Sequence, residues 1–96
     1  MIYEWDPQKN QQNIKDHGID FETAIQVFTD VNGFEFYDDR HSSLKEERWK
    51  RIGRIYRGDV YMVVYTENEK SNIIRIITAF TDAKIESSYY ERQKNK

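Results

Sequence analysis

The sequence predicts one α+β domain over residues 1–96: two N-terminal helices, a curled antiparallel sheet of about four to five strands, and a C-terminal helix. Three observations support this. Helix-capping residues bracket segments before residue 30, apolar residues alternate with polar ones between residues 34 and 80, and helical spacing returns in residues 81–96. Separate runs of helix and strand are typical of the α+β class. A chain of 96 residues is long enough to bury one core but not two.

The N-terminal third predicts a short strand in IYEW (residues 2–5), followed by two helices. In DPQKNQQNIKDHG (residues 6–18), Asp6 is placed to cap a helix, Pro7 suits its first turn, and Gly18 suits its end. Asp20 can cap a second helix. The residues that share its apolar face, and that we expect in the core, are Phe21, Ala24, Ile25 and Phe28.

From residue 34 onward the period changes to two, which predicts strands. FEFY (34–37), RWKRIGRIY (48–56), VYMVVYT (60–66) and NIIRIITAF (72–80) are separated by the polar segment 38–47, a Gly58-Asp59 turn and ENEKSN. Such short connections favour antiparallel hairpins. In the last segment Ile85 and Tyr89 are four residues apart, which predicts a closing helix with an apolar face.

Composition excludes several classes of protein. The charged fraction is 33%, but aromatic residues at 15% favour a folded chain. The absence of cysteine excludes disulfides and thiolate metal sites. No apolar run has the length of a membrane span and the first residues lack the pattern of a signal peptide, so we expect a cytoplasmic protein with no membrane partner. His17 and His41 have no matching ligand spacing, so we expect neither a metal nor a cofactor.

The formal net charge of −2 conceals a segregation along the chain. Residues 1–39 hold nine acidic residues against Lys9 and Lys15, whereas residues 40–57 hold seven basic residues against Glu46 and Glu47. This favours a molecule with one acidic and one cationic surface, suited to two different partners. Solvated charge that happens to cluster is the alternative.

The cations concentrate in KEERWKRIGRIYRG (residues 45–58), which includes Lys45. Alternation along this predicted strand puts Arg48, Lys50, Ile52, Arg54 and Tyr56 on one face and Trp49, Arg51, Gly53 and Ile55 on the other. Neither face is wholly apolar, so we expect one end of the strand on the core and the other in an open groove. Guanidinium groups suit phosphate oxygens and aromatic rings stack on bases. The candidate RNA-binding residues are Lys50, Arg51, Arg54, Arg57, His41 and Trp49; basic side chains lying over an ordinary sheet edge are the alternative.

Arg75 is the only charged residue in NIIRIITAF. A charge among apolar residues is costly to bury unless it is paired. It is therefore either a structural ion pair with Glu47 or Glu67, or an arginine that binds phosphate and stabilises a transition state.

The sequence also resembles the BrnT family. The resemblance rests on EWDPQKNQQNIKDHGIDFETAIQVF, EERW followed by IG, VVYTE, IRIITA, and Glu86 and Tyr90 near the C-terminus. Members of this family are toxins of bacterial type II toxin–antitoxin pairs. The positions that match the family's recurring polar residues are His17, Glu47, Arg48, Tyr65, Glu67, Arg75, Glu86 and Tyr90.

The resemblance implies a RelE-like fold and a metal-independent ribonuclease that cleaves RNA and arrests growth. It also implies a cognate BrnA-like ribbon-helix-helix antitoxin, which neutralises the toxin and through which the complex binds operator DNA. One departure stands out: family members commonly have arginine where this chain has Phe80, after Thr78 and Ala79. This departure implies a weakened activity.

Cleavage without a metal requires the RNA 2′-hydroxyl as nucleophile, a base, and cations that stabilise the charged phosphorane. Arg48 and Arg75 are the candidates for charge stabilisation, with Lys50 and Arg54 on the flanking backbone. Glu47 is the candidate base, or it orients one of these arginines. Tyr65 stacks a base, donates a proton, or only packs in the sheet. For His41 the alternatives are a groove or an exposed loop. A non-catalytic RNA-binding or protein-interaction domain with a degenerate active site remains the alternative function.

Overall fold

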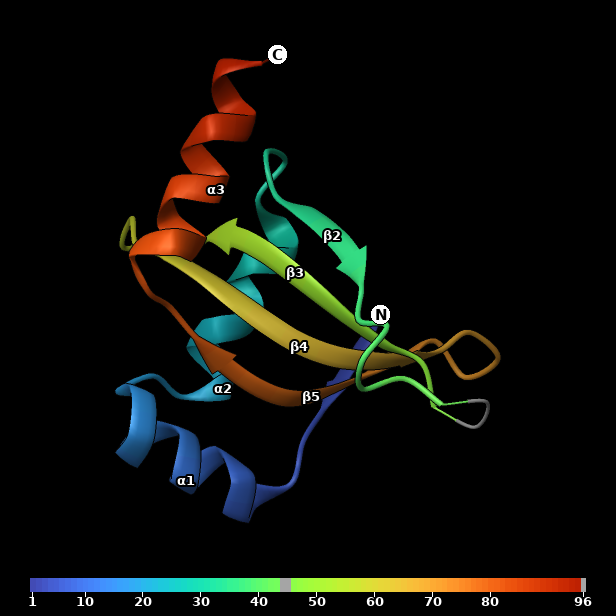
Figure 1. Ribbon diagram of the computed structural model, residues 1–96. Coiled ribbons are helices and arrows are strands. Elements are labelled where there is room, and N and C mark those ends of the chain that lie inside the picture. The colour runs from blue at the N-terminus through green and yellow to red at the C-terminus, as the bar shows by residue number, and fades with distance from the viewer. Residues whose placement is uncertain (44–45, 96) are drawn as a thin grey trace.

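The computed structural model describes residues 1–43 and 46–95, so Lys45 of the basic segment lies outside the described residues. It confirms the α+β class, with three α-helices, one 3-10 helix and a five-stranded sheet (Figure 1). The elements are β1 (Ile2–Glu4), α1 (Pro7–His17), α2 (Phe21–Ala24), η1 (Ile25–Thr29), β2 (Phe34–Tyr37), β3 (Arg48–Arg54), β4 (Val60–Asn68), β5 (Ile73–Phe80) and α3 (Ala83–Lys94). None of the helices in the described ranges is both long enough and apolar enough to cross a membrane.

The strand order in the sheet is β1-β5-β4-β3-β2. Strands β2 to β5 pair with their sequence neighbours in antiparallel hairpins, as predicted. Strand β1 instead pairs in parallel with β5, where Tyr3 lies opposite Ile74. The prediction of a wholly antiparallel sheet is therefore wrong at this edge. Residues 5–72 connect these two strands, and a long connection permits parallel pairing where a tight hairpin does not.

The sheet separates two apolar clusters, so the expected single core is divided into two layers. On one face, α2 and η1 contribute Phe21 and Val27 to a cluster with alternate residues of β4 and β5. On the other face, Ile85 and Tyr89 of α3 pack against Ile52, Val60 and Met62 of the sheet. In Figure 1, α3 stands at one end of the sheet, where β3 ends and β4 begins. The α3 face is therefore packed at that end.

Helix α1 forms as predicted and fastens the free side of β5. The Asp6 carboxylate accepts the backbone N–H of Gln8 at 2.8 Å, and Gly18 ends the helix with a φ of 70°. The buried Asn13 side chain accepts the backbone N–H of Ala79 at 3.1 Å and donates to its carbonyl at 2.9 Å. The Asn13 side chain thus takes the place of a neighbouring strand at a position of β5 that β1 does not reach.

The second helix is shorter than predicted. It is α-helical only over α2 and then tightens into η1, and Asp20 makes no side-chain cap. The side chain of Asn10 accepts the Phe21 N–H at 2.8 Å instead. Phe21, Ala24 and Val27 are fully buried and three residues apart, which is the spacing of a 3-10 helix. Ile25 and Phe28 were also predicted to be core residues, but both are only partly buried.

Candidate active site

Strand register gathers the predicted catalytic arginines on the α3 face, away from the end that α3 covers. Arg48 of β3 lies opposite Thr66 of β4, and Thr66 lies opposite Arg75 of β5. Neighbouring strands are about 4.8 Å apart, so the Cα atoms of the two arginines are about 10 Å apart. Lys50 lies on the same face, two residues along β3. We call Arg48, Lys50 and Arg75 the cationic row.

Arg75 is not the buried residue that its apolar neighbours predicted. Its side chain is 48% exposed and forms an ion pair with Glu4 of β1, with the two charged atoms 3.7 Å apart. Of the two alternatives for Arg75, the buried ion pair with Glu47 or Glu67 is therefore wrong, and the phosphate-binding role stays a prediction. Alternation along β5 buries Ile74 and Ile76 and turns Arg75 outward, while the parallel strand β1 supplies the acid.

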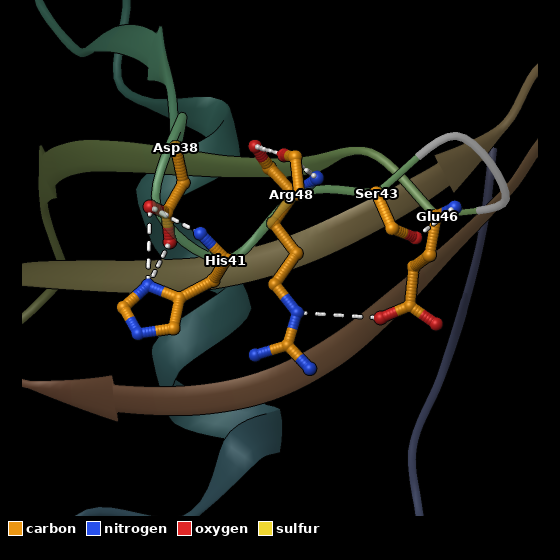
Figure 2. A network of polar contacts seen from close by, with 6 residues as sticks. Asp38, His41, Ser43, Glu46 and Arg48 are labelled. Atoms are coloured by element: carbon orange, nitrogen blue, oxygen red, sulfur yellow. Dashed lines mark hydrogen bonds and ion pairs between the residues drawn. The ribbon is translucent and has the colours of Figure 1, made fainter.

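The connection from β2 to β3 is fastened to the first residue of β3 (Figure 2). The backbone N–H of Asp38 donates to the Arg48 carbonyl at 2.9 Å. The backbone N–H of Arg48 donates to the Ser42 hydroxyl at 2.8 Å, and its side chain pairs with Glu46 at 3.3 Å. Side chains of this connection are therefore held beside the cationic row.

Within this connection, Asp38 and His41 form a pair. The Asp38 side chain is only 5% exposed, and its carboxylate oxygens lie 3.0 and 3.2 Å from Nδ1 of His41. The same carboxylate accepts the backbone N–H of His41 at 3.3 Å. Figure 2 shows the imidazole and the Arg48 side chain projecting the same way from the chain. The histidine side chain itself is 60% exposed, so its second ring nitrogen is open to a ligand.

The electrostatics of this pair favour an ionised carboxylate. Burial raises the pKa of Asp38, but the hydrogen bond from His41 and the charges of Lys50 and His41 outweigh burial and lower that pKa below its usual range. An ionised Asp38 accepts a hydrogen bond, so Nδ1 of His41 carries the proton. A neutral imidazole in this tautomer leaves Nε2 as a proton acceptor.

Two other predicted catalytic residues, Glu47 and Tyr65, lie on the opposite face of the sheet. Together with Trp49 they line a hollow of about 330 Å³ whose remaining residues are Glu35, Glu67 and Glu69. Tyr65 is buried and packs edge-on against Phe28, with ring centroids 5.0 Å apart. Burial, together with Glu35 and Glu67, raises the pKa of Tyr65. The structure therefore separates Tyr65 from the cationic row. Glu47 also lines a second hollow with Glu46 and Thr66, which are the ion-pair partner and the cross-strand neighbour of Arg48.

The remaining predicted RNA-binding arginines are bonded within the fold. Arg51 is 14% exposed and donates to the carbonyls of Val27 and Asp30, both at 2.9 Å. Arg54 donates to the Tyr90 hydroxyl at 3.0 Å, and Arg57 pairs with Asp59 at 2.8 Å. Of the six predicted RNA-binding residues, the structure places Lys50 and His41 on the same face as Arg48.

An apolar groove of about 380 Å³ runs between the sheet and α3, next to the cationic row. Lys50 lines it, and its aromatic residues are Phe34, Phe36 and Phe80. Phe36 is 39% exposed, whereas Phe80 is half-buried and also lies 5.8 Å from the His17 ring. Phe80 thus lies on the same face as the predicted active site, at its apolar border.

Asp38 is the site residue that sequence reasoning missed. The signal that points to it is DDRH, in which an acid precedes a histidine by three residues in the polar segment before the basic strand. Within residues 1–43 and 46–95, no group of three or more histidine and acidic side chains is arranged to bind a metal ion.

Comparisons with known proteins show the family of this chain and a similar fold. The family described as "Ribonuclease toxin, BrnT, of type II toxin-antitoxin system" matches residues 5–84. The crystal structure of the Brucella abortus ribonuclease toxin BrnT superposes with a TM-score of 0.59 at 20% sequence identity. The match covers 86% of this chain and 99% of that chain, and at this identity it establishes likeness of fold. No curated protein sequence matches significantly.

Proposed function

Because this chain belongs to the BrnT family of ribonuclease toxins from type II toxin–antitoxin systems, we propose that it cleaves RNA without a metal ion. We place the reaction at the cationic row. The observation that carries this proposal is the register that sets Arg48 and Arg75 on either side of Thr66, on a face where Arg75 is half exposed. Two guanidinium groups at this spacing are placed to bind a phosphate from both sides.

The reaction that fits these residues is an internal transesterification. The 2′-oxygen of RNA attacks the adjacent phosphorus, the bond from phosphorus to the 5′-oxygen breaks, and the products end in a 2′,3′-cyclic phosphate and a 5′-hydroxyl. Negative charge grows on the phosphorane oxygens as the 2′-oxygen bonds. Fixed cations aimed at that charge stabilise the transition state more than the substrate. Arg48 and Arg75 fill this role in our proposal, and Lys50 holds the flanking backbone.

The apolar groove gives the bases of a single strand a place beside the cleaved phosphate. Exposed aromatic rings stack on bases of any sequence. Phe36 and Phe80 border the groove next to Lys50. In this proposal Phe80 contacts a base where other family members have a cation, and the missing cation weakens catalysis.

We propose further that the antitoxin is a BrnA-like ribbon-helix-helix protein that covers the cationic row. A partner placed there blocks RNA and neutralises the exposed charges of Arg48 and Arg75 together. Operator DNA is then bound by the antitoxin part of the complex. Mixing the toxin with the product of a neighbouring ribbon-helix-helix gene tests this, because an equimolar amount is expected to abolish cleavage.

The test of the enzymatic proposal is cleavage of a long messenger RNA by the purified chain in EDTA. Each of Arg48→Ala and Arg75→Ala is expected to lower the rate by a hundredfold or more, equivalent to about 3 kcal/mol of transition-state stabilisation. Arg57→Ala is the matched control, because Arg57 is exposed and paired with Asp59 in the turn after β3. The new ends are examined for cyclic phosphate, and circular dichroism confirms that every variant is folded.

The same experiment separates the alternative function. A folded wild-type protein that binds RNA with strong salt dependence and leaves it intact would be a binding module with a degenerate site. Cleavage that disappears in EDTA and returns with added Mg²⁺ would contradict the metal-independent mechanism while leaving the ribonuclease activity in place.

A further inference from the structure

We infer that His41 is the general base of this reaction and that Asp38 is its positioning residue. The inference rests on the proposed function, since it assigns a proton acceptor to the same site. It is motivated by the need for a proton acceptor, which the cationic row does not supply, because arginine and lysine are charged at neutral pH and do not accept a proton.

The geometry of the pair fits a general base whose ring is oriented by a carboxylate at Nδ1, the nitrogen that does not accept the proton. Asp38 contacts both the ring nitrogen Nδ1 and the backbone N–H of His41, and its own N–H is bonded to the carbonyl of Arg48. These bonds fix the turn and the carboxylate relative to the first residue of β3. The Asp38 side chain is 5% exposed and the His41 side chain 60% exposed. One end of the imidazole is therefore held, and the other faces outward.

The charged groups around the imidazole suit proton acceptance. The carboxylate of Asp38 acts on it from its own turn and stabilises the imidazolium that forms when Nε2 takes a proton. Arg48 and Lys50 of β3 are the neighbouring cations on this face, and Arg48 is paired with Glu46. Imidazole is the side chain whose ordinary pKa lies closest to neutrality, which suits a base at cellular pH.

In the proposed step, Nε2 of His41 removes the proton from the 2′-hydroxyl while the 2′-oxygen bonds to phosphorus. The bond from phosphorus to the 5′-oxygen breaks, and this oxygen leaves with a proton from water. The imidazolium then returns its proton to the hydroxide left in solvent. Nothing is oxidised or reduced, and His41 is restored for the next turnover.

The experiment measures cleavage rate against pH in EDTA for the wild type, His41→Gln and Asp38→Asn. Affinity is measured separately with an RNA that carries 2′-O-methyl groups and cannot be cleaved. His41→Gln is expected to lower the rate by about 10²- to 10⁴-fold and to remove the acidic limb of the pH profile. Its affinity for the uncleavable RNA should change by less than about threefold, since the ring's task is proton transfer.

Asp38→Asn keeps the size of the side chain and removes its charge. It is expected to lower the rate by about tenfold or more and to shift the acidic limb of the profile. The control is Asp39→Asn, which alters the acid next to Asp38. Asp39 is exposed, so this change should not move the profile. If Asp38→Asn fails to fold, His41→Gln still decides the question.

Each outcome bears on the proposal in a defined way. A wild type that cleaves and a His41→Gln variant within threefold of it would overturn the role of His41 and leave the ribonuclease proposal standing. Equal losses of rate and affinity would overturn it too, because His41 would then be a binding residue. A folded wild type that leaves RNA intact would overturn both proposals. Loss of rate alone, with retained affinity, supports the assignment.

Discussion

Arg48 and Arg51 are three residues apart in one strand and have different surroundings because side chains alternate across a sheet. Arg48 projects beside His41 on the α3 face. Arg51 points to the other face, where its guanidinium donates hydrogen bonds to the backbone carbonyls of Val27 and Asp30 at the end of η1. Alternation along β3 was predictable from the sequence. The sequence did not predict which helix covers each face of the sheet, or at which end, because η1 and α3 come from distant parts of the chain.

Asp38 shows a second limit at the level of single residues. Its partner His41 was recognised from the sequence, but a neighbouring Asp39 offers the same chemistry one position away. The distinction between the two acids arises from the backbone, since the N–H of Asp38 extends the pairing with β3 and turns its side chain inward. Sequence patterns do not resolve a difference of one residue in a turn.

Asp30 gives a prediction about pH at this scale. Burial raises the pKa of Asp30, but hydrogen bonds from the Tyr89 hydroxyl and from the N–H groups of Arg54 and Asn32 lower it below its ordinary value. A carboxyl group with a lower pKa in the folded protein than in the unfolded chain adds stability above about pH 4. That contribution is lost as the pH falls through the folded-state pKa.

We therefore expect Asp30→Asn to be less stable than the wild type at pH 7 and to lose less stability between about pH 4 and pH 2. Urea unfolding across this range provides the measurement. Asp16→Asn, an exposed change on α1, should keep the wild-type pH dependence. Parallel curves for the wild type and Asp30→Asn would contradict the assignment.

At the scale of elements, η1 illustrates how a tertiary contact overrides a predicted helix. A Cβ atom added at Gly53 would lie 2.8 Å from the carbonyl oxygen of Val27, so the glycine lets η1 lie directly on β3. Helical spacing correctly predicted a buried apolar face in this segment. It could not predict how closely η1 lies on β3, because that approach depends on a glycine located on another element.

The link between α1 and β5 gives the second prediction. We expect Asn13→Asp to destabilise the fold by about 3 kcal/mol, because the buried carboxylate loses both donated bonds and faces the carbonyls of Ile19 and Ala79. Chemical denaturation measures the loss. Gln11→Glu, which adds the same charge at an exposed position of α1, should change stability by less than about 0.5 kcal/mol. Equal effects of the two changes would contradict the bridging role of Asn13.

At the level of the complete fold, the sheet carries an acidic hollow on one face and the cationic row on the other. Glu47 and Arg48 are adjacent in sequence, yet Glu47 lines the acidic hollow on one face and Arg48 belongs to the cationic row on the other. The fold class and the hairpins were predictable from the sequence, and the catalytic role of Arg48 and Arg75 stays a prediction. The placement of Tyr65 on the face opposite to these arginines required the register of β3 and β4.

This separation predicts a localised electrostatic footprint. Lys50→Ala is expected to reduce the salt dependence of binding to uncleavable single-stranded RNA, lowering the slope of log affinity against log salt by about 0.7. Titrations at several salt concentrations give the slope. Lys9→Ala, which removes an exposed cation from α1, should leave it unchanged. A lower salt-dependence slope for Lys9→Ala, with an unchanged slope for Lys50→Ala, would place the bound RNA elsewhere on the molecule.

The parallel pairing of β1 with β5 also affects how the protein matures during translation. The first strand to leave the ribosome finds its sheet partner only after residues 73–75 have been synthesised, and α3 follows later still. Contacts between segments so distant in sequence form late in folding, since the chain between them must first be ordered. A nascent chain therefore lacks the Glu4–Arg75 pair, and with Arg75 one of the three members of its cationic row, until residues 73–75 have been synthesised.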